Sequence, residues 1–344
     1  MQAVRLFALS FVFYFQFAYA QINYTLINQF DDHMGEIECV VLSPDGKTLV
    51  TADEMGYMIF WDVATMKSID KVKQHSARIN SLLFNKSGNQ FVTCDENGKV
   101  KLWDFTTHKV LKEYNAAFNI VAFAVLSADE KYIYFGGYST SYTSTRSNVQ
   151  TSLYKVNVNG ESSPEIVGKN YFDSRPTEAD AGITDGNIDV SGKYIIITKG
   201  THTYFWSTDK QNFTFNIPSS TSLNNLLPTS DFIYVWGSGT MIKLDVKSGY
   251  RPTITIDATS NSYSASYSKM AISNDKKLLI SGEDGTDVNI WNLPDLSIKQ
   301  VLKGHSATVK TFTFAKNDSI IITGGYDGEL IVWGNSIKIG RAHV

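Results

Sequence analysis

The side chains best suited to covalent chemistry in this chain are histidine, threonine and aspartate residues that recur together. His305, Thr323 and Asp327 could supply the base, nucleophile and carboxylate of a hydrolase triad. Similar sets begin at His33 and His75, and each of these three histidines stands 28 residues before a tryptophan. A nucleophilic site needs one constellation in one cleft, whereas these sets repeat. We therefore expect buried, hydrogen-bonded structural groups and no catalytic residue.

Metal and cofactor chemistry has few candidate ligands. Of the six histidines, three belong to the repeated sets and His343 lies in the tail, which leaves His108 and His202. The chain has no GxSxG, HExxH or phosphate-loop motif. Cys39 and Cys94 are either two buried free thiols or one disulfide between neighbouring repeats. We expect neither a metal nor a cofactor.

The overall charge argues against binding to polyanions. The 344 residues carry a formal net charge of −3, and 43% of them are hydrophobic while 19% are charged. A surface for nucleic acid or anionic membrane needs an excess of basic residues, which this chain lacks. The same composition can bury a large core, so the chain should fold without cross-links.

The two ends of the chain are expected to lie outside the folded part. Residues 1–20 have one basic residue, an apolar run and a final Ala18-Tyr19-Ala20, as a secretory signal peptide does. An uncleaved anchor and a misassigned start are the alternatives. Residues 339–344 spell the translation of a common sequencing adapter, and the alternative is a native tail that spells it by chance.

These ends leave residues 21–338 as the folded domain. No second apolar run of membrane-spanning length follows the leader, so we expect no membrane contact after its removal. The leader predicts a secreted protein or one in the lumen of the secretory pathway. If the leader is spurious, the protein is intracellular.

A repeat of 42 residues organises the domain. Trp61 and Trp103 are 42 residues apart, and so are Trp291 and Trp333. Between them lie short apolar runs with an alternating pattern, separated by Asp-Gly or Asn-Gly turns. Such runs are typical of β-strands, four to a repeat. The period and the pattern predict an all-β repeat protein.

The repeats resemble those of the WD-repeat family of β-propellers. The resemblance rests on Trp-Asp pairs at 61–62 and 103–104 and on Gly304-His305, and it covers nearly the whole domain. It implies seven blades of about 45 residues each. Two divergent blades end near Tyr154 and near Leu244. The other five blades are marked by Trp61, Trp103, Trp206, Trp291 and Trp333.

The N-terminal strand of the domain should close the ring. Residues 24–30 match the outer-strand segments 67–73 and 296–302. An open sheet edge between the first and last blades would invite aggregation, so propellers hide that edge. We expect residues 24–30 to supply the fourth strand of blade seven. The predicted fold is a seven-bladed WD-repeat β-propeller closed by an N-terminal strand.

The resemblance also implies a hydrogen-bonded set of histidine, serine or threonine, aspartate and tryptophan inside the blades. Blade two has Asn97 and blade one has Met55 at the aspartate position, and blade six lacks the histidine. The remaining members are His33, Thr51 and Trp61 in blade one, His75, Thr93 and Trp103 in blade two, Ser281, Asp284 and Trp291 in blade six, and His305, Thr323, Asp327 and Trp333 in blade seven.

Partner-binding residues are expected on one face of the ring. Blade three inserts residues 139–148 between its second and third strands, and the connections into blades four, five and six are long and rich in Tyr, Ser and Asn. Such loops on a rigid scaffold are typical of adaptable recognition surfaces, although solvated loops of degenerate repeats have the same composition. The candidates from these loops are Tyr138, Tyr142, Arg146, Tyr171, Phe172, Tyr263 and Tyr267.

A second set of candidates comes from the regular blades. The residue three positions after each histidine should point toward the mouth of the central channel, and so should residues beside the turn between the second and third strands. Their charges are mixed, which favours a protein or peptide partner over a highly charged ligand. These candidates are Glu36, Arg78, Thr308, Glu54, Glu96 and Tyr326.

The function that these observations predict is a monomeric, non-catalytic protein-interaction module or scaffold. One alternative is a secreted propeller enzyme or small-ligand binder that uses the central channel. A convergent cluster of carboxylates in the channel would favour that alternative, and the sequence shows no clear one. The other alternative is an intracellular WD-repeat scaffold, since a fold does not by itself settle function.

Overall fold

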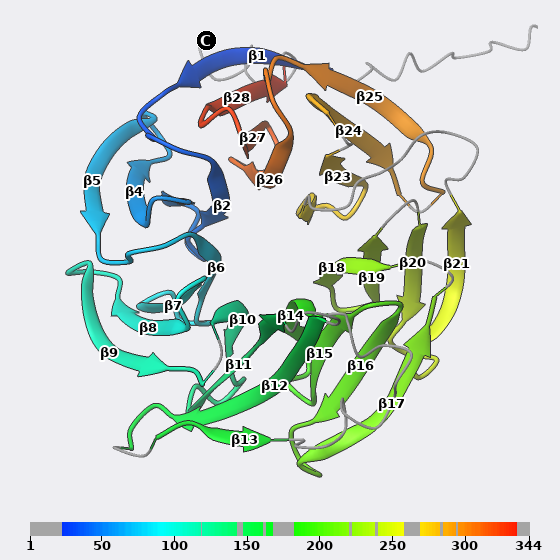
Figure 1. The fold of residues 1–344 in the computed structure, drawn as a ribbon. Helices are drawn as coiled ribbons and strands as arrows, with labels where there is room; N and C mark the ends of the chain where they lie inside the picture. The colour runs from blue at the N-terminus through cyan, green and yellow to red at the C-terminus, as the bar shows by residue number, and fades with distance from the viewer. Residues whose placement is uncertain are drawn as a thin grey trace, which may run out of the picture.

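The strands of the computed structural model are arranged as blades around a central channel (Figure 1). The structure describes residues 23–117, 119–142, 147–160, 163–167, 182–219, 222–237, 240–257, 269–282, 285–293 and 295–335. Within these ranges, 28 strands form seven antiparallel sheets of four strands each. The same ranges hold no helix with the length and apolarity to cross a membrane. The predicted leader, the predicted adapter tail and Asp284 lie outside them.

The first four blades follow one another along the chain, each running from the channel outward. Blade one is β2 (Ile37–Leu42), β3 (Thr48–Asp53), β4 (Tyr57–Asp62) and β5 (Lys67–Lys73). Blade two is β6 (Ile79–Phe84), β7 (Gln90–Asp95), β8 (Lys99–Asp104) and β9 (Lys109–Asn115). Blade three is β10 (Ile120–Leu126), β11 (Tyr132–Tyr142), β12 (Ser147–Asn157) and β13 (Glu165–Val167). Blade four is β14 (Ile183–Ile188), β15 (Tyr194–Lys199), β16 (His202–Ser207) and β17 (Asn212–Pro218).

The last three blades complete the ring, and the two divergent blades have the same four-stranded order as the others. Blade five is β18 (Leu223–Pro228), β19 (Phe232–Gly237), β20 (Thr240–Asp245) and β21 (Arg251–Asp257). Blade six is β22 (Met270–Ile272), β23 (Leu278–Gly282), β24 (Asp287–Asn292) and β25 (Ile298–Lys303). Blade seven is β26 (Val309–Ala315), β27 (Ile320–Gly325), β28 (Leu330–Asn335) and β1 (Tyr24–Phe30).

The core lies in layers between neighbouring blades. The middle strands of a blade are covered on both faces, so both faces carry apolar side chains, and Val50 on β3 and Phe60 on β4 are fully buried. Phe60 packs with Phe91 and Trp103 of blade two, whose rings stack with centroids 5.5 Å apart. The outer strands face solvent and alternate instead, as β5 does. Burial on two faces explains why the middle strands read as continuous apolar runs.

The N-terminal strand closes the ring, as the sequence predicts. β1 pairs antiparallel with β28 from Tyr24 opposite Asn335 to Phe30 opposite Leu330. Figure 1 shows this blue strand beside the red and orange strands of the last blades. The Tyr24 hydroxyl donates a hydrogen bond of 2.6 Å to the carbonyl oxygen of Asp318, and burial raises the pKa of that hydroxyl. The first strand is therefore bonded to blade seven through both backbone and side chain.

Blade three differs from the sequence prediction. The inserted residues 139–148 are in large part a continuation of the hairpin, because β11 and β12 each have 11 residues and pair as far as Tyr142 opposite Ser147. Serine, threonine and tyrosine alternate along residues 138–142, and threonine and tyrosine favour extended backbone. The polar composition that indicated a loop therefore belongs to a long two-stranded ribbon.

Candidate functional site

The repeated polar sets lie inside the blades. In blade one, His33 Nδ1 is 2.8 Å from Asp53 Oδ2, His33 Nε2 is 2.6 Å from Thr51 Oγ1, and Trp61 Nε1 donates to the same hydroxyl at 2.9 Å. These bonds tie the loop before β2 to β3 and β4. The same bonds, at 2.7 to 3.0 Å, join His75, Thr93, Asp95 and Trp103 in blade two and His305, Thr323, Asp327 and Trp333 in blade seven.

The direction of the bonds follows from what each group can donate. An ionised carboxylate only accepts, so His33 Nδ1 donates to Asp53, and in the neutral ring Nε2 then accepts the proton of the Thr51 hydroxyl. Thr51 Oγ1 in turn accepts from Trp61, and the threonine is fully buried. A hydroxyl that is saturated and shielded in this way has no access to a substrate. The sets stabilise the blades.

The aspartate assignment in blades one and two was wrong. Asp53 and Asp95 fill the position, two residues before Met55 and Asn97, whereas Asn97 donates from its side chain to Ser76 Oγ at 3.3 Å. Asp95 is the last residue of β7, and its Oδ1 accepts from the backbone of the following turn. Blade seven has Gly325 at that strand end, so its carboxylate comes from the turn instead.

The remaining marker tryptophans lie in partial sets. Trp291 Nε1 donates to Ser281 Oγ at 3.0 Å, as the sequence predicts for blade six. In blade four the register places Ile197 where the other blades have a hydroxyl, so nothing accepts the Nε1 proton of the buried Trp206 in the described part of the chain. Trp206 therefore contributes packing without the hydrogen bond.

One group of potential metal ligands occurs among the described residues. One ligand atom each from His305, Asp327 and Glu329 lies within 4.8 Å of the others. Both ring nitrogens of His305 already bond to Asp327 and to Thr323. A metal ion here would have to break the set that stabilises blade seven, so the geometry favours the hydrogen-bonded role.

The mouth of the central channel holds one arginine among four glutamates. Arg78 Nη1 is 2.8 Å from Glu36 Oε2, Arg78 Nη2 is 2.8 Å from Glu54 Oε2, and Arg78 Nε is 3.6 Å from Glu96 Oε1. Arg78 Nη1 also contacts Glu38. Burial opposes the charge on Arg78, but the hydrogen bond to Glu36 and the charge of Glu38 outweigh it and raise the pKa of the guanidinium. The arginine therefore holds the four carboxylates together.

The other two predicted mouth residues join the same network through a lysine. Lys310 Nζ donates to the Tyr326 hydroxyl at 2.9 Å and is 3.3 Å from Glu38 Oε2. The backbone N–H of Tyr326 donates to the carbonyl oxygen of Thr308 at 2.9 Å. We name the connected residues the channel-mouth network: Glu36, Glu38, Glu54, Arg78, Glu96, Thr308, Lys310 and Tyr326.

Sequence reasoning missed Glu38 and Lys310 because a β-bulge recurs in the inner strands. In six of these strands one residue is skipped in the pairing with the second strand, which is a β-bulge that re-aims a side chain. Glu38, Asn80 and Lys310 each stand five residues after the histidine of their blade, and this spacing could have found them. The skipped residues are Glu38, Asn80, Ala122, Thr184, Asn224 and Lys310.

The loop candidates are largely beyond what the structure describes. Tyr138 is half-buried on β11 and packs against Gly182, where an added Cβ would lie 2.5 Å from the tyrosine ring. It lines the channel and is not at a loop tip. Tyr142 is the last residue of β11, and only its backbone pairing is described. The other candidates, Arg146, Tyr171, Phe172, Tyr263 and Tyr267, lie outside the described residues.

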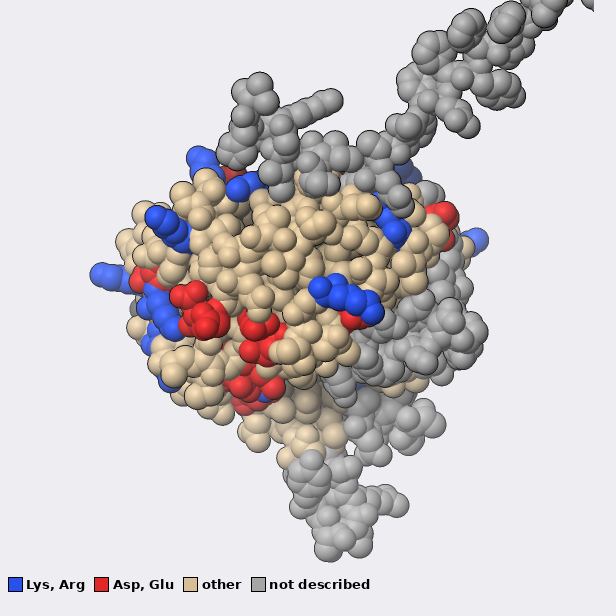
Figure 2. Space-filling view, turned by 90° about the horizontal axis from the view of Figure 1, so that it is seen from above, with Lys and Arg blue, Asp and Glu red and all other residues tan. Residues whose placement is uncertain are grey.

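The outer edge of the ring exposes apolar side chains where β1 meets β25. Leu26 and Ile27 on β1 and Ile298 and Val301 on β25 are between 39% and 47% exposed. Gln300 on β25 bonds to the backbone of Tyr24, which places the start of β1 next to β25. Figure 2 views this edge and shows basic and acidic side chains scattered around a wide uncharged area. The edge has no charge of one dominant sign.

The two cysteines are free thiols in the structure. Cys39 on β2 and Cys94 on β7 are both fully buried, and burial raises the pKa of each thiol. A raised pKa keeps a thiol protonated and unreactive at neutral pH. Of the two alternatives that the sequence leaves open, the structure has the buried free thiols.

These observations define a seven-bladed β-propeller whose regular blades are held by histidine, aspartate, threonine and tryptophan sets. The family model for the WD domain, G-beta repeat, matches residues 24–62, 66–104 and 296–334. These are the three segments that contain the complete sets. Three segments of the chain are therefore WD repeats, and the described residues form a seven-bladed β-propeller.

Similar proteins extend this assignment to the fold. DDB1- and CUL4-associated factor 10 from Xenopus laevis and from Homo sapiens are each 33% identical to this chain over 60 residues, or 17% of the chain. The match covers 13% of the Xenopus laevis protein and 11% of the Homo sapiens protein, so this chain spans only a small part of these relatives. The crystal structure of the β-propeller domain of Cps50 (Swd1) from Myceliophteria thermophila matches with a TM-score of 0.75 and 15% identity, over 91% of this chain and 100% of that one. At that identity the likeness shows the shared fold.

Proposed function

We propose that this chain is a non-catalytic protein-interaction scaffold whose recognition surface is the channel-mouth network. The observation that carries the proposal is the set of contacts by which Arg78 joins four glutamates from two blades. Side chains held by several bonds lose little conformational freedom when a partner binds, and such preorganisation favours recognition. The three matched WD repeats agree with a scaffold role.

The charge of the network indicates what it binds. Its four glutamates exceed its two cations, Arg78 and Lys310, and the Glu96 side chain is still 43% exposed. An acidic rim around a channel attracts a basic group and repels an acidic one. We infer a protein or peptide partner that presents a lysine or arginine to the mouth of the channel.

The contacts of the network speak against catalysis by three of its four glutamates. A channel enzyme would need carboxylates that are free to exchange protons with a substrate. Here Glu36, Glu38 and Glu54 are engaged by Arg78, and Glu38 also pairs with Lys310. The buried threonines of the polar sets are saturated by hydrogen bonds.

We test the recognition surface with a peptide-display selection against the folded protein. Wild type should enrich peptides that carry lysine or arginine, and Glu96→Lys should lose them because it reverses a charge at the rim. Asp129→Lys is the matched control, since Asp129 lies in the turn between β10 and β11, at the opposite end of the strands from Glu96. Enrichment without basic residues, or peptides that Glu96→Lys retains, would contradict the proposal.

For the cellular setting we propose the secretory pathway, on the strength of residues 1–20. The alternative is an intracellular scaffold, and the names of the matched relatives suggest partners of the DDB1 and CUL4 type for that case. Expression with the native N-terminus in a eukaryotic secretory host separates the two. The chain has Asn-x-Ser/Thr glycosylation sequons that begin at Asn23, Asn85, Asn212 and Asn317. A mature protein that begins at Gln21 and carries sugar on some of these sites supports secretion, and retention with Met1 intact and no sugar contradicts it.

A further inference from the structure

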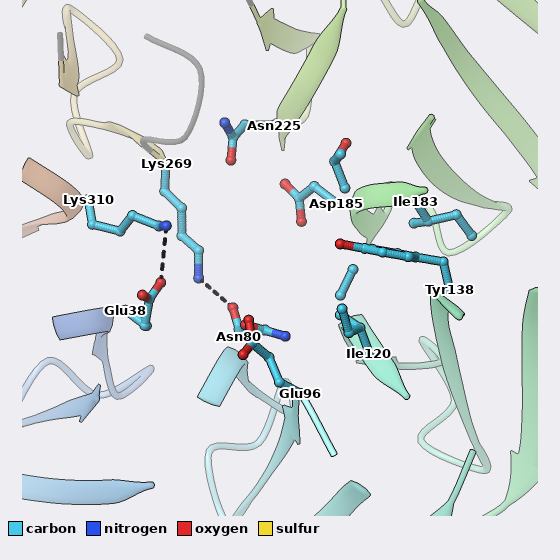
Figure 3. Close-up of a pocket in the computed structure, with 12 residues that line it drawn as sticks. Glu38, Asn80, Glu96, Ile120, Tyr138, Ile183, Asp185, Asn225, Lys269 and Lys310 are labelled. Atoms are coloured by element: carbon cyan, nitrogen blue, oxygen red, sulfur yellow. Dashed lines mark hydrogen bonds and ion pairs between the residues drawn. The ribbon is translucent and has the colours of Figure 1, made fainter. Parts of the chain in front are cut away.

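The central channel contains a cavity of about 210 Å³ next to the channel-mouth network. Figure 3 shows Lys269 reaching into it from one side and Asp185 and Tyr138 from the other, with Asn225 between them. Asp185 is on β14, Asn225 is on β18 and Lys269 directly precedes β22. The cavity is therefore lined by polar groups that come from different blades and meet in the channel.

Asp185 is a carboxyl without a cation beside it. The backbone N–H of Gly186 donates to Asp185 Oδ1 at 2.8 Å, and the N–H of Leu226 donates to Asp185 Oδ2 at 3.0 Å. No described lysine, arginine or histidine lies within ion-pair distance of it. Burial raises the pKa of Asp185 to about 6, so most of the carboxyl is ionised at neutral pH. A half-buried carboxylate without a counter-charge still loses part of its hydration, and a ligand cation would offset that loss.

Lys269 is a cation in the same cavity without a carboxylate beside it. Its Nζ donates to the carbonyl oxygen of Asn80 at 3.1 Å and lies 3.3 Å from Cys39 Sγ. Among the described residues, no carboxylate is within ion-pair distance of Nζ. Burial opposes the charge of the Lys269 ammonium, and the negative charge of Asp185 across the cavity favours it. Asp185 and Lys269 influence each other's charge across the cavity and do not touch.

Asn225 provides an independent sign of a missing partner. It is 8% exposed, it lines the cavity, and its Nδ2 atom has no acceptor among the described residues. Buried amide nitrogens are nearly always hydrogen-bonded, so an unpaired one beside a cavity indicates a place for an acceptor. The Asn225 side chain stands at the wall of the cavity between Lys269 and Asp185 (Figure 3).

The geometry points to a binding site for a small zwitterion, of the kind of a free α-amino acid, in this cavity. The carboxylate of the ligand would pair with Lys269 Nζ and accept from Asn225 Nδ2, and its ammonium would pair with Asp185. A ligand of a single sign would satisfy one of the two protein charges and leave the other unpaired. Glu38, Glu96 and Lys310 of the channel-mouth network also line this cavity, so the site adjoins the protein-recognition surface proposed above. The ligand is a free zwitterion and not a peptide side chain, so the two proposals are tested by different probes.

Isothermal titration calorimetry tests the site with the full folded chain. Each of the common L-amino acids is titrated up to about 10 mM, and ethylamine and propionate serve as the singly charged relatives of alanine. We expect heat of binding from at least one amino acid, and at least about tenfold weaker binding from its singly charged relatives. No binding by any amino acid, or equal binding by an amine or an acid alone, overturns the proposal.

Two variants of nearly native shape assign the site to its residues. Lys269→Met and Asp185→Asn each remove one of the two charges, and each should weaken the binding of the amino acid by about tenfold or more. Lys276→Met removes a lysine whose side chain is 56% exposed and should bind as wild type does. Thermal melting checks that each variant is folded. Unchanged affinity for the amino acid in both cavity variants would overturn the assignment of the site to Lys269 and Asp185. If a variant does not fold, the comparison of amino acids with their singly charged relatives on the wild type still tests the proposal.

Discussion

Replacement of Asp185 by asparagine should change the pH dependence of stability. Burial raises the pKa of this carboxyl from the ordinary 3.8 to about 6. Between these two pH values, the folded chain keeps a proton that the unfolded chain has released. Linkage then requires that the contribution of Asp185 to the free energy of unfolding falls as pH rises from about 4 to about 6. Above that range this contribution is constant. Asparagine carries no charge and removes this contribution.

The expected magnitude follows from the two pKa values. Their difference corresponds to about 3 kcal/mol of unfolding free energy. Near pH 4 both side chains are neutral and both accept from the N–H of Gly186 or Leu226, so wild type and variant should be similarly stable. Near pH 7 the variant should be the more stable protein by up to about 3 kcal/mol, because the wild type then holds a half-buried charge that no described cation pairs with.

Urea unfolding followed by tryptophan fluorescence measures this effect at several pH values between 4 and 7. The quantity of interest is the difference in unfolding free energy between Asp185→Asn and wild type at each pH, because other titrating groups cancel in it. Glu165→Gln removes an exposed carboxyl on the outer strand β13 and serves as the control. A difference that does not change with pH, or a variant that is less stable near pH 7, would refute the reasoning.

Three other substitutions test separate parts of the structure. Trp333→Phe should cost about 1 kcal/mol more than Trp206→Phe, because only Trp333 donates to a hydroxyl, that of Thr323, and equal losses in chemical unfolding would contradict this. Arg78→Met should destabilise the protein by about 1–3 kcal/mol because it leaves glutamates unpaired, and the loss should be smaller in high salt. A loss in melting temperature that is the same at low and high salt would contradict the network. Tyr24→Phe removes the bond to Asp318 and should cost about 1 kcal/mol, and an unchanged melting temperature would mean that this bond does not help to close the ring.

The ring could be predicted from the sequence because its determinants are periodic. The spacing of His33 and Trp61 recurs in two other blades, and this recurrence predicts where the strands of the regular blades lie. The match of residues 24–30 to other outer strands predicted ring closure, and β1 pairs with β28 as expected. Periodic apolar patterns survive in degenerate blades because burial on both faces constrains every blade alike.

The finer parts of the site could not be read from spacing, since local backbone geometry decides them. Asp95 and Asp327 bring a carboxylate to the same place from positions that differ by two residues relative to the histidine. The bulges turn Glu38 and Lys310 into the channel, and a simple two-residue alternation does not include a bulge. Asp185 and Lys269 are 84 positions apart, so only the closed ring brings them to one cavity.

Photo-cross-linking tests the central claim, that a partner docks on the mouth of the channel, most directly. A photoreactive amino acid is placed at position 96 in one protein and at position 129, at the opposite end of the strands, in the other. Both are irradiated in the cells that produce the native protein. We expect a protein partner that is cross-linked at position 96 and absent at position 129, with a lysine or arginine near the cross-linked site of the partner. Cross-links at position 129 alone, or a partner segment of acidic residues at position 96, would contradict it.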